Sequence, residues 1–174
     1  MTQQAMMQLL AVIVGGLIAT AGGLYTNVFI ERERRKRESN NLALAFKGEI
    51  TALLEHIKER RYQERFGEVI AEIEQTRQPF LMPFRVRFRY DRVYDSNVSR
   101  IGSLKEPLPE LIPLFYIHVN AILEDLLSMG DETYARLDMD TLLRIYRDLL
   151  HVLGETIKVG EEILEHVDEL YPKR

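Results

Sequence analysis

The chain has 174 residues, 46% of them hydrophobic and 29% charged, and it contains neither Cys nor Trp. This composition excludes a chain that is disordered throughout, a collagen-like repeat and a disulfide-stapled secreted mini-protein. Residues 1–30 carry no charged side chain, so all 23 basic and 27 acidic residues lie between residues 31 and 174. That remainder is long enough for one domain with a sizeable core.

A long uncharged stretch, residues 6–30, reads MMQLLAVIVGGLIATAGGLYTNVFI. About 20 apolar residues in a helix are enough to cross the hydrocarbon core of a membrane, and a buried core helix rarely stays uncharged for so long. A cleaved signal peptide is the other alternative, because Ala19-Thr20-Ala21 resembles a cleavage site, but no Lys or Arg precedes the stretch. We therefore predict that residues 1–30 form a transmembrane anchor.

Positive charge follows the apolar stretch directly. Five basic residues lie in one short run: Arg32, Arg34, Arg35, Lys36 and Arg37. By the positive-inside rule these residues stay in the cytoplasm, so the N-terminus lies outside and residues 31–174 lie inside. We expect residues 31–41 to form a basic juxtamembrane segment whose side chains contact anionic lipid headgroups.

Small residues recur on one face of the predicted span, at Gly15, Ala19 and Gly22. Their spacing of four and three allows the close approach of a second helix. That helix would belong either to a second copy of the chain or to another membrane protein. Alternatively, the pattern reflects only the general frequency of Gly and Ala in membrane helices.

Helical periodicity continues through the cytoplasmic part. We expect a first cytoplasmic helix to begin at residues 39–41, where Ser and Asn are good capping residues, unless it continues the predicted span without a break, and to run to about Thr76. It is either unbroken or divided into two helices near residues 60–62. Pro79 and Pro83 then require a loop.

The second half of the chain predicts three further helices. The first is short and is opened by residues 95–97, the second covers about residues 111–129, and the last runs from Asp138 or Asp140 to about Leu170. Pro113 is compatible with the second helix only in its first turn. We expect this helix to bury Leu111, Leu114, Phe115, Ile122 and Leu126. We therefore predict an all-α fold, in which one N-terminal transmembrane helix precedes a cytoplasmic antiparallel helical bundle, residues 42–174, of three long helices and one short helix.

Apolar and basic residues alternate from Phe84 to Tyr90. The period of two indicates an extended segment at about residues 84–90, which we expect to lie across the helices because no second strand is predicted to pair with it. Five arginines are candidates for contact with an anion or a partner: Arg85, Arg87, Arg89, Arg92 and Arg100. Alternatively, they lie on a solvated face or pair with residues 105–174, which carry 7 basic and 15 acidic side chains.

Catalytic motifs are missing from the sequence. There is no Gly-rich phosphate-binding loop, no G-x-S-x-G element and no H-E-x-x-H helix. Two His–Glu pairs, His151 with Glu155 and Glu162 with His166, are spaced four apart, but such pairs are typical of solvated helix surfaces. The domain as a whole is not basic, which argues against binding of nucleic acid. We expect no enzyme activity, no cofactor and no bound metal.

Three short elements follow one another along the chain. They are Phe46-Lys47-Gly48-Glu49-Ile50, then Tyr94-Asp95-Ser96-Asn97 with Ile101-Gly102-Ser103-Leu104, and then Phe115-Tyr116. In this order they resemble an uncharacterised group of small bacterial single-span membrane proteins, in which a Y-D-x-N-x-x-x-I-G-x-L element precedes a helix bearing F-Y. The resemblance covers roughly residues 1–125 and implies a bacterial origin and the same architecture. It implies no activity, and the alternating arginines are not part of it.

The residues of this motif indicate a structural corner. Asp95 or Asn97 is suited to cap the short helix, and Gly102 would allow a turn or a close approach between elements. Tyr94 and Tyr116 would contribute hydroxyl groups to the same corner. The alternative is that these five residues form a site for a partner or a ligand.

The leading hypothesis is a non-enzymatic interaction or scaffold module on the bacterial inner membrane. Its partners would be the membrane itself, with its anionic headgroups, and either a second copy of the chain or another membrane protein. The alternative is a ligand-responsive sensor or effector that binds an anionic small molecule through its arginine segment. A hydrolase or metalloenzyme would require a bound metal, which we do not expect.

Overall fold

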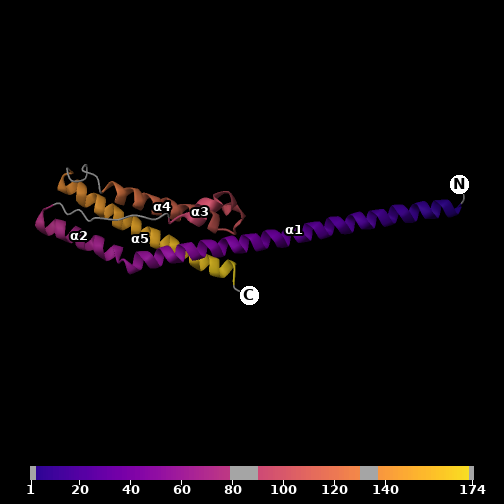
Figure 1. Cartoon of the computed structure of the whole chain (residues 1–174), viewed down its shortest axis with the longest axis horizontal. Coiled ribbons are helices and arrows are strands. Elements are labelled where there is room, and N and C mark those ends of the chain that lie inside the picture. The colour runs from indigo at the N-terminus through magenta and orange to yellow at the C-terminus, as the bar shows by residue number, and fades with distance from the viewer. Residues whose placement is uncertain (1–2, 79–89, 130–136, 173–174) are drawn as a thin grey trace. The chain divides into compact units, whose positions relative to one another are not determined.

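The computed structural model describes residues 3–78, 90–129 and 137–172, and within α1 it leaves out the side chains of residues 3–15, 17–22 and 24. Every regular element in these ranges is helical, which confirms the predicted all-α class. The elements are α1 (Gln3–Glu59), α2 (Tyr62–Thr76), α3 (Arg92–Asn97), the 3₁₀ helix η1 (Val98–Ser103), α4 (Leu108–Ser128) and α5 (Met139–Leu170) (Figure 1). The chain divides into two compact units, Met1–Asn40 and Asn41–Arg174. The predicted extended segment at residues 84–90 falls almost entirely outside the described residues.

The predicted helix start at residues 39–41 is wrong, because α1 begins at Gln3 and passes through these residues. Ser or Asn can cap a helix only at its N-terminal end, where the backbone before it is not helical. Here the residues before position 39 are themselves helical. Glu31 accepts hydrogen bonds from Arg34 and Arg35, and Arg34 also contacts Glu38, all at a spacing of three or four residues. Such pairs stabilise a continuous helix.

Two helices, not one, cover residues 42–76. The chain breaks at Arg61, whose φ of 52° lies in the left-handed region, and α2 then begins at Tyr62. At the other end of α2, Arg77 also has a positive φ, and its N–H donates to the Ile73 carbonyl at 2.9 Å. A left-handed residue of this kind is a common way to end a helix. The predicted end at Thr76 is confirmed.

The short helix begins earlier than its sequence predicts. α3 starts at Arg92 and ends at Asn97, so neither Asp95 nor Asn97 is its N-cap. The chain continues as η1, which buries Ile101 and is followed by the buried Leu104, whereas Val98 is 52% exposed.

Two expectations for α4 are corrected by its start at Leu108. Pro113 lies inside the helix and past its first turn, so the carbonyl of Pro109 receives no backbone N–H from it. Leu114, expected in the core, is 40% exposed, because the buried stripe of α4 runs through Ile112, Phe115 and Val119.

The last helix forms as predicted. α5 begins at Met139, directly after Asp138, whose carboxylate accepts the Thr141 N–H at 2.9 Å and the Thr141 hydroxyl at 2.7 Å. These hydrogen bonds hold the pKa of Asp138 below its usual range, with the backbone N–H of Thr141 as the largest cause.

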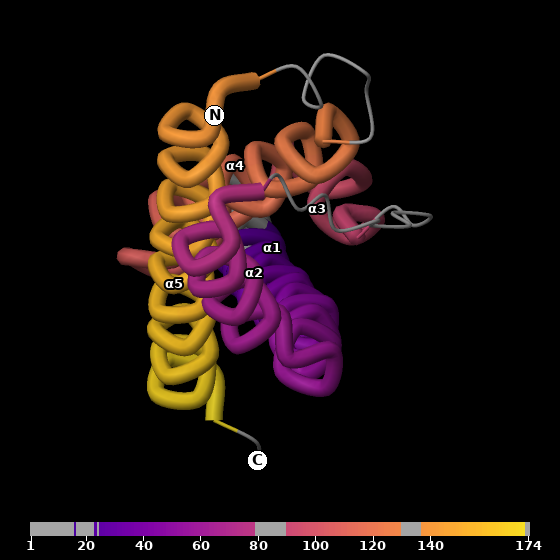
Figure 2. Tube along the Cα trace, turned by 90° about the vertical axis from the view of Figure 1, so that its left-hand side faces the viewer, coloured from indigo at the N-terminus to yellow at the C-terminus, as the bar shows by residue number. Residues whose placement is uncertain are grey.

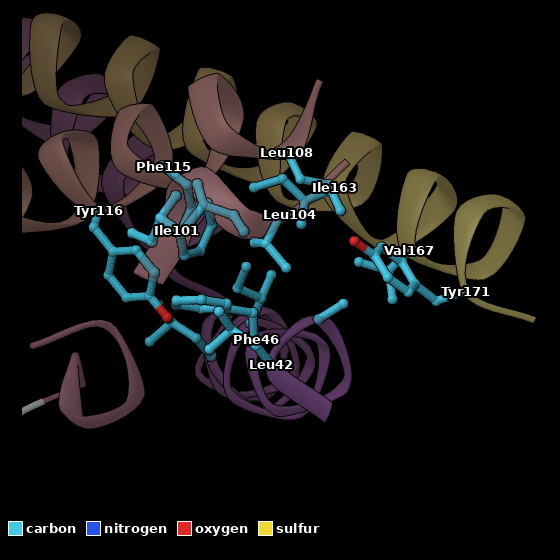
Figure 3. Packing of buried hydrophobic residues seen from close by; sticks show 14 of the residues in the cluster. Leu42, Phe46, Ile101, Leu104, Leu108, Phe115, Tyr116, Ile163, Val167 and Tyr171 are labelled. Carbon is cyan, nitrogen blue, oxygen red and sulfur yellow. The ribbon is translucent and has the colours of Figure 1, made fainter. Parts of the chain in front are cut away.

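Two apolar clusters form the core of the Asn41–Arg174 unit, and α5 contributes to both of them. The first joins α1, η1, α4 and the C-terminal half of α5, with Phe46, Leu108, Phe115 and Ile163 at its centre (Figure 3). The second joins α2, the end of α4 and the N-terminal half of α5. α5 accordingly lies beside both α2 and α4 (Figures 1 and 2).

Gly160 on α5 lies in a close contact between α5, α4 and α1. A Cβ atom at this position would lie 2.9 Å from the Phe115 ring on α4 and 3.0 Å from a Leu54 methyl group on α1. The absence of a side chain therefore permits this packing. At Gly154, six residues earlier on α5, the nearest atom would be 4.0 Å away.

Among the described residues, α4 is the helix that is long and apolar enough to cross a membrane, with a mean hydropathy of 1.3 over its best window, 28% of which is buried. This property rests on the length and composition of α4 alone, and α4 also supplies seven buried residues to the core. Its apolar character is therefore accounted for in part by packing. The span predicted at residues 6–30 lies within α1, largely among side chains that are not described, and it stays a prediction.

Candidate functional site

Glu49 lies at the border of an apolar stripe of α1. It is half-buried there: Phe46 lies one turn before it and Ile50 directly after it, and both are fully buried. A carboxylate in this position needs hydrogen-bond donors, because burial of an unpaired charge is costly. The donors come from two elements that are distant in the sequence.

The Glu49 carboxylate accepts hydrogen bonds from both α3 and α4. One oxygen accepts the Val93 backbone N–H at 2.7 Å, and the other accepts the Tyr94 N–H at 3.3 Å and the Tyr116 hydroxyl. Val93 and Tyr94 lie in the first turn of α3, where backbone N–H groups have no partner within the helix. Glu49 therefore caps α3 from another helix, a role that Asp91 at the N-cap position does not perform with its own side chain.

Tyr116 fixes the opposite side of this corner. Its ring stacks on Tyr94 with 4.3 Å between centroids and an interplanar angle of 21°, and it meets Phe115 edge-on at 5.2 Å. Figure 3 shows Tyr116 reaching from α4 toward α1. Burial is the largest cause of a pKa well above the usual range for the Tyr116 hydroxyl, and the hydrogen bond to Glu49 raises the pKa further. The hydroxyl therefore stays protonated and donates to the carboxylate.

The other motif residues support α3 and η1 locally. The Asn97 side-chain amide donates to the Val93 carbonyl at 2.8 Å, and its oxygen accepts from Arg100 at 3.2 Å. Asp95 is exposed in the first turn of α3. Gly102 does not permit a close approach, because a Cβ atom there would meet nothing within 4 Å and its φ is not positive. The close approach expected at Gly102 is therefore wrong, and the residue lies within η1.

The corner of Glu49, Tyr94 and Tyr116 holds three helices together. Its hydrogen bonds join the carboxylate of α1 to the backbone of α3 and to a side chain of α4, and its polar groups are directed at one another. A carboxylate held by three hydrogen-bond donors is fixed in position, which suits a structural role better than proton transfer.

The candidate arginines are only partly described. Arg85, Arg87 and Arg89 lie outside the described residues. Arg92 on α3 and Arg100 on η1 are both exposed, and Arg100 donates to Asn97.

The residues predicted to meet the membrane lie in the Met1–Asn40 unit. Gly15, Ala19 and Gly22 are part of α1, but their surroundings are not described. The five basic residues expected at lipid headgroups, Arg32, Arg34, Arg35, Lys36 and Arg37, are all exposed. The hydrogen bonds from Arg34 and then Arg35 lower the pKa of Glu31 to about 2, so this carboxylate offsets part of their positive charge.

A second feature, on the outside of α4, has an apolar centre between acidic ends. We define the α4 outer face by five exposed residues at spacings of four and three: Glu110, Leu114, Ile117, Ala121 and Glu124. Leu114 and Ile117 are 40% and 62% exposed. No Lys or Arg occurs in α4. Asp125 adds to the negative charge beside this face, and its pKa is raised first by burial and then by the charges of Glu124 and Asp148.

Sequence reasoning missed Glu49 as a capping residue and missed the α4 outer face. A signal existed for Glu49, because an acidic residue at the border of the apolar stripe, one turn after Phe46, requires an explanation. The outer face was hidden because the sequence placed Leu114 in the core. Among the described residues, no three or more His, Asp or Glu side chains lie close enough together to hold a metal ion.

No protein-family model, no curated protein and no solved structure matches the chain.

Proposed function

We propose that this protein is a non-enzymatic interaction module of the bacterial inner membrane. A span at residues 6–30 anchors it, with the N-terminus outside and residues 31–174 in the cytoplasm. The cytoplasmic helical bundle then binds a partner protein through the α4 outer face. The observation that carries the proposal is the exposure of Leu114 and Ile117 between acidic residues on a helix that already fills the core with its other side.

The α4 outer face indicates the chemistry of its partner. Leu114 and Ile117 lie one turn apart and form an apolar centre, and exposed apolar centres with polar rims mark interaction sites. Glu110 lies at one end of this centre and Glu124 at the other. A second copy of the same face would bring like charges together, which is unfavourable. The partner is therefore an amphipathic segment whose apolar residues are flanked by Lys or Arg.

Support for the anchor comes from the described side chains at the end of the predicted span. Val28, Phe29 and Ile30 are 50%, 58% and 58% exposed, although they are consecutive and so point in different directions around α1. A helix that is apolar on all sides suits a lipid environment. Confinement of the domain to the membrane surface would raise its effective concentration toward other membrane proteins.

The direct test is binding of a designed peptide to the full-length protein in lipid nanodiscs. An amphipathic helical peptide with Leu and Lys should bind, and a peptide of the same pattern with Glu in place of Lys should not. Added salt should weaken binding, because salt screens exposed charges. Fluorescence anisotropy of the labelled peptide measures each case.

Two variants test whether peptide binding depends on the α4 outer face or on any exposed apolar residue. Ile117→Asp should abolish binding, whereas Val98→Asp, the same change at an apolar residue of η1 that is 52% exposed, should leave it unchanged. Equal binding by both peptides, or equal loss in both variants, would remove the α4 outer face from the proposal. The orientation is tested separately with reporter enzymes fused after Arg174. A reporter that works only in the cytoplasm should be active, and one that works only in the periplasm should be inactive.

A further inference from the structure

An apolar cavity of about 70 Å³ lies inside the helical domain, on the side of α4 that faces away from the outer face. Four helices supply its walls. The apolar lining residues are Leu53 and Ile57 of α1, Phe66 of α2, Val119, Ile122, Leu123 and Leu126 of α4, and Leu153 of α5. One water needs roughly 10–15 Å³ of such space, so the cavity has room for more than a single water. Its apolar walls give a water few partners and favour an apolar occupant.

The polar groups of the cavity gather at one end. The His56 ring lies 6.2 Å from the Tyr62 ring and 5.9 Å from the Tyr90 ring, so the three form one aromatic cluster. All three are partly exposed, whereas Phe66, Val119 and Leu153 are buried. The cluster therefore marks the open end. Thr156, the other polar lining residue, donates its hydroxyl proton to the Val152 carbonyl, so this proton is not directed at the cavity.

Positive charge lies close to this open end. Arg60 and Arg61, at the break between α1 and α2, are both exposed. Arg60 is near enough to Tyr90 for its charge to lower the pKa of the hydroxyl, against the larger raising effect of burial. An imidazole, two phenol groups and a guanidinium would together receive a negatively charged or strongly polar head.

We propose that this cavity binds one acyl chain, with its anionic head held at the cluster of His56, Tyr62 and Tyr90. The apolar walls accept the hydrocarbon tail, and the volume suits the end of a single chain. Two sources share this chemistry, a free fatty acid and a membrane lipid that inserts one of its chains. The site is separate from the α4 outer face, and the proposal does not depend on that face.

The test is photo-labelling of the full-length protein in nanodiscs. One arm uses decanoic acid with a diazirine at the end of its chain, and the other uses phosphatidylglycerol with the same photoreactive chain. Mass spectrometry of the peptides should place the label in residues 62–76 and 108–128, which line the cavity, in addition to the background in residues 1–40. Label in the first arm identifies a free fatty acid, and label in the second identifies a membrane lipid.

Matched variants decide whether the label reports the cavity. Val119→Phe fills the space and should reduce cavity label at least about tenfold, whereas Ile117→Phe, the same change on the exposed side of α4, should not. His56→Gln leaves the walls intact and should weaken labelling by the fatty acid several-fold without affecting the corresponding photoreactive fatty alcohol. Absence of cavity label in both arms, or unchanged label in Val119→Phe and His56→Gln, would overturn the proposal.

Discussion

Glu49 on α1 accepts a hydrogen bond from the hydroxyl of Tyr116 on α4, and its carboxylate also receives the first backbone N–H groups of α3. One side chain of α1 therefore binds α3 and α4 through donors that lie more than forty residues later in the sequence. The motif residues Tyr94 and Tyr116 stack directly beside it. The corner fixes α3 and η1 against α1 and α4, and so completes the first core cluster.

Replacement of Glu49 by Ala should destabilise the domain by about 2–3 kcal/mol, because three part-buried donors lose their charged acceptor. Tyr116→Phe should cost less, since Glu49 retains its two backbone partners. Unfolding of the full-length protein, followed by circular dichroism, measures both effects. The double variant should show a coupling energy of about 1 kcal/mol, because the two side chains contact each other.

The control for this cycle is Glu55→Ala, a change at an exposed residue one and a half turns further along α1. It should alter stability by no more than about 0.5 kcal/mol. Similar losses in Glu49→Ala and Glu55→Ala would show that the corner does not stabilise the fold.

Alkaline pH should destabilise the wild type more than Tyr116→Phe. The pKa of the Tyr116 hydroxyl is raised by burial and by Glu49, so in the folded state it stays protonated above its usual pKa of 10.0. The unfolded chain ionises there, so the stability that depends on this group is complete below pH 10.0 and falls as pH rises further. The difference between the two proteins should change by about 1.4 kcal/mol per pH unit. Parallel stability curves between neutral pH and pH 11 or so would contradict the assignment.

Asp138→Ala should lower the unfolding midpoint by roughly 2–4 °C at neutral pH, because α5 loses its N-cap. Hydrogen bonds from Thr141 hold the pKa of Asp138 below its ordinary value of 3.8. The contribution of this carboxylate is therefore complete above that pH and is lost as pH falls through the lower, folded-state value. Asp138→Asn, which can still accept the Thr141 N–H, should lie close to the wild type at neutral pH. A gap between wild type and Asp138→Ala that persists unchanged at low pH would be inconsistent with this cap.

Gly154→Ala and Gly160→Ala make the same chemical change on one helix and should have opposite effects. Ala is a better helix former than Gly by about 1 kcal/mol, and Gly154 has space for a methyl group, so this variant should be stabilised. At Gly160 the new Cβ atom would lie 2.9 Å from the Phe115 ring. Overpacking should outweigh the helix preference and destabilise Gly160→Ala by about 1 kcal/mol. Equal stabilisation of both variants would show that the three helices do not meet closely at Gly160.

Local signals made parts of the fold predictable. The apolar periodicity of residues 142–167 predicted α5 and placed its start at Asp138 or Asp140, of which Asp138 is the cap. The end of α2 at Thr76 followed from the same kind of pattern. These features depend on residues within one or two turns of each other, so a single sequence contains the information.

Long-range contacts were not predictable in the same way. The α3 helix begins at Arg92 because Glu49, from another helix, satisfies its first N–H groups, and no local pattern near Arg92 reveals that partner. The close packing at Gly160 depends in the same way on Phe115 and Leu54. The exposure of Leu114 depends on which side of α4 meets α5, and this is set by the packing of the whole domain.

For the candidate site, the sequence drew attention to Tyr94 and Tyr116, and the structure places them in contact. The sequence assigned the cap of the short helix to Asp95 or Asn97, because such residues are locally suited to that role, whereas the cap is supplied by Glu49 from α1. Glu110 and Glu124 are evident in the sequence, but they could be assigned to one surface only once the residues between them were known to be exposed.

The most direct test of the proposed function is photo-crosslinking from the α4 outer face in native membranes. A photoreactive amino acid at position 117 should give one adduct of defined mass, and the basic amphipathic peptide should compete it away. The same amino acid at the exposed position 161 of α5 should not give this adduct. Indistinguishable adducts from positions 117 and 161, or adducts that the peptide does not displace, would contradict a partner site on this face.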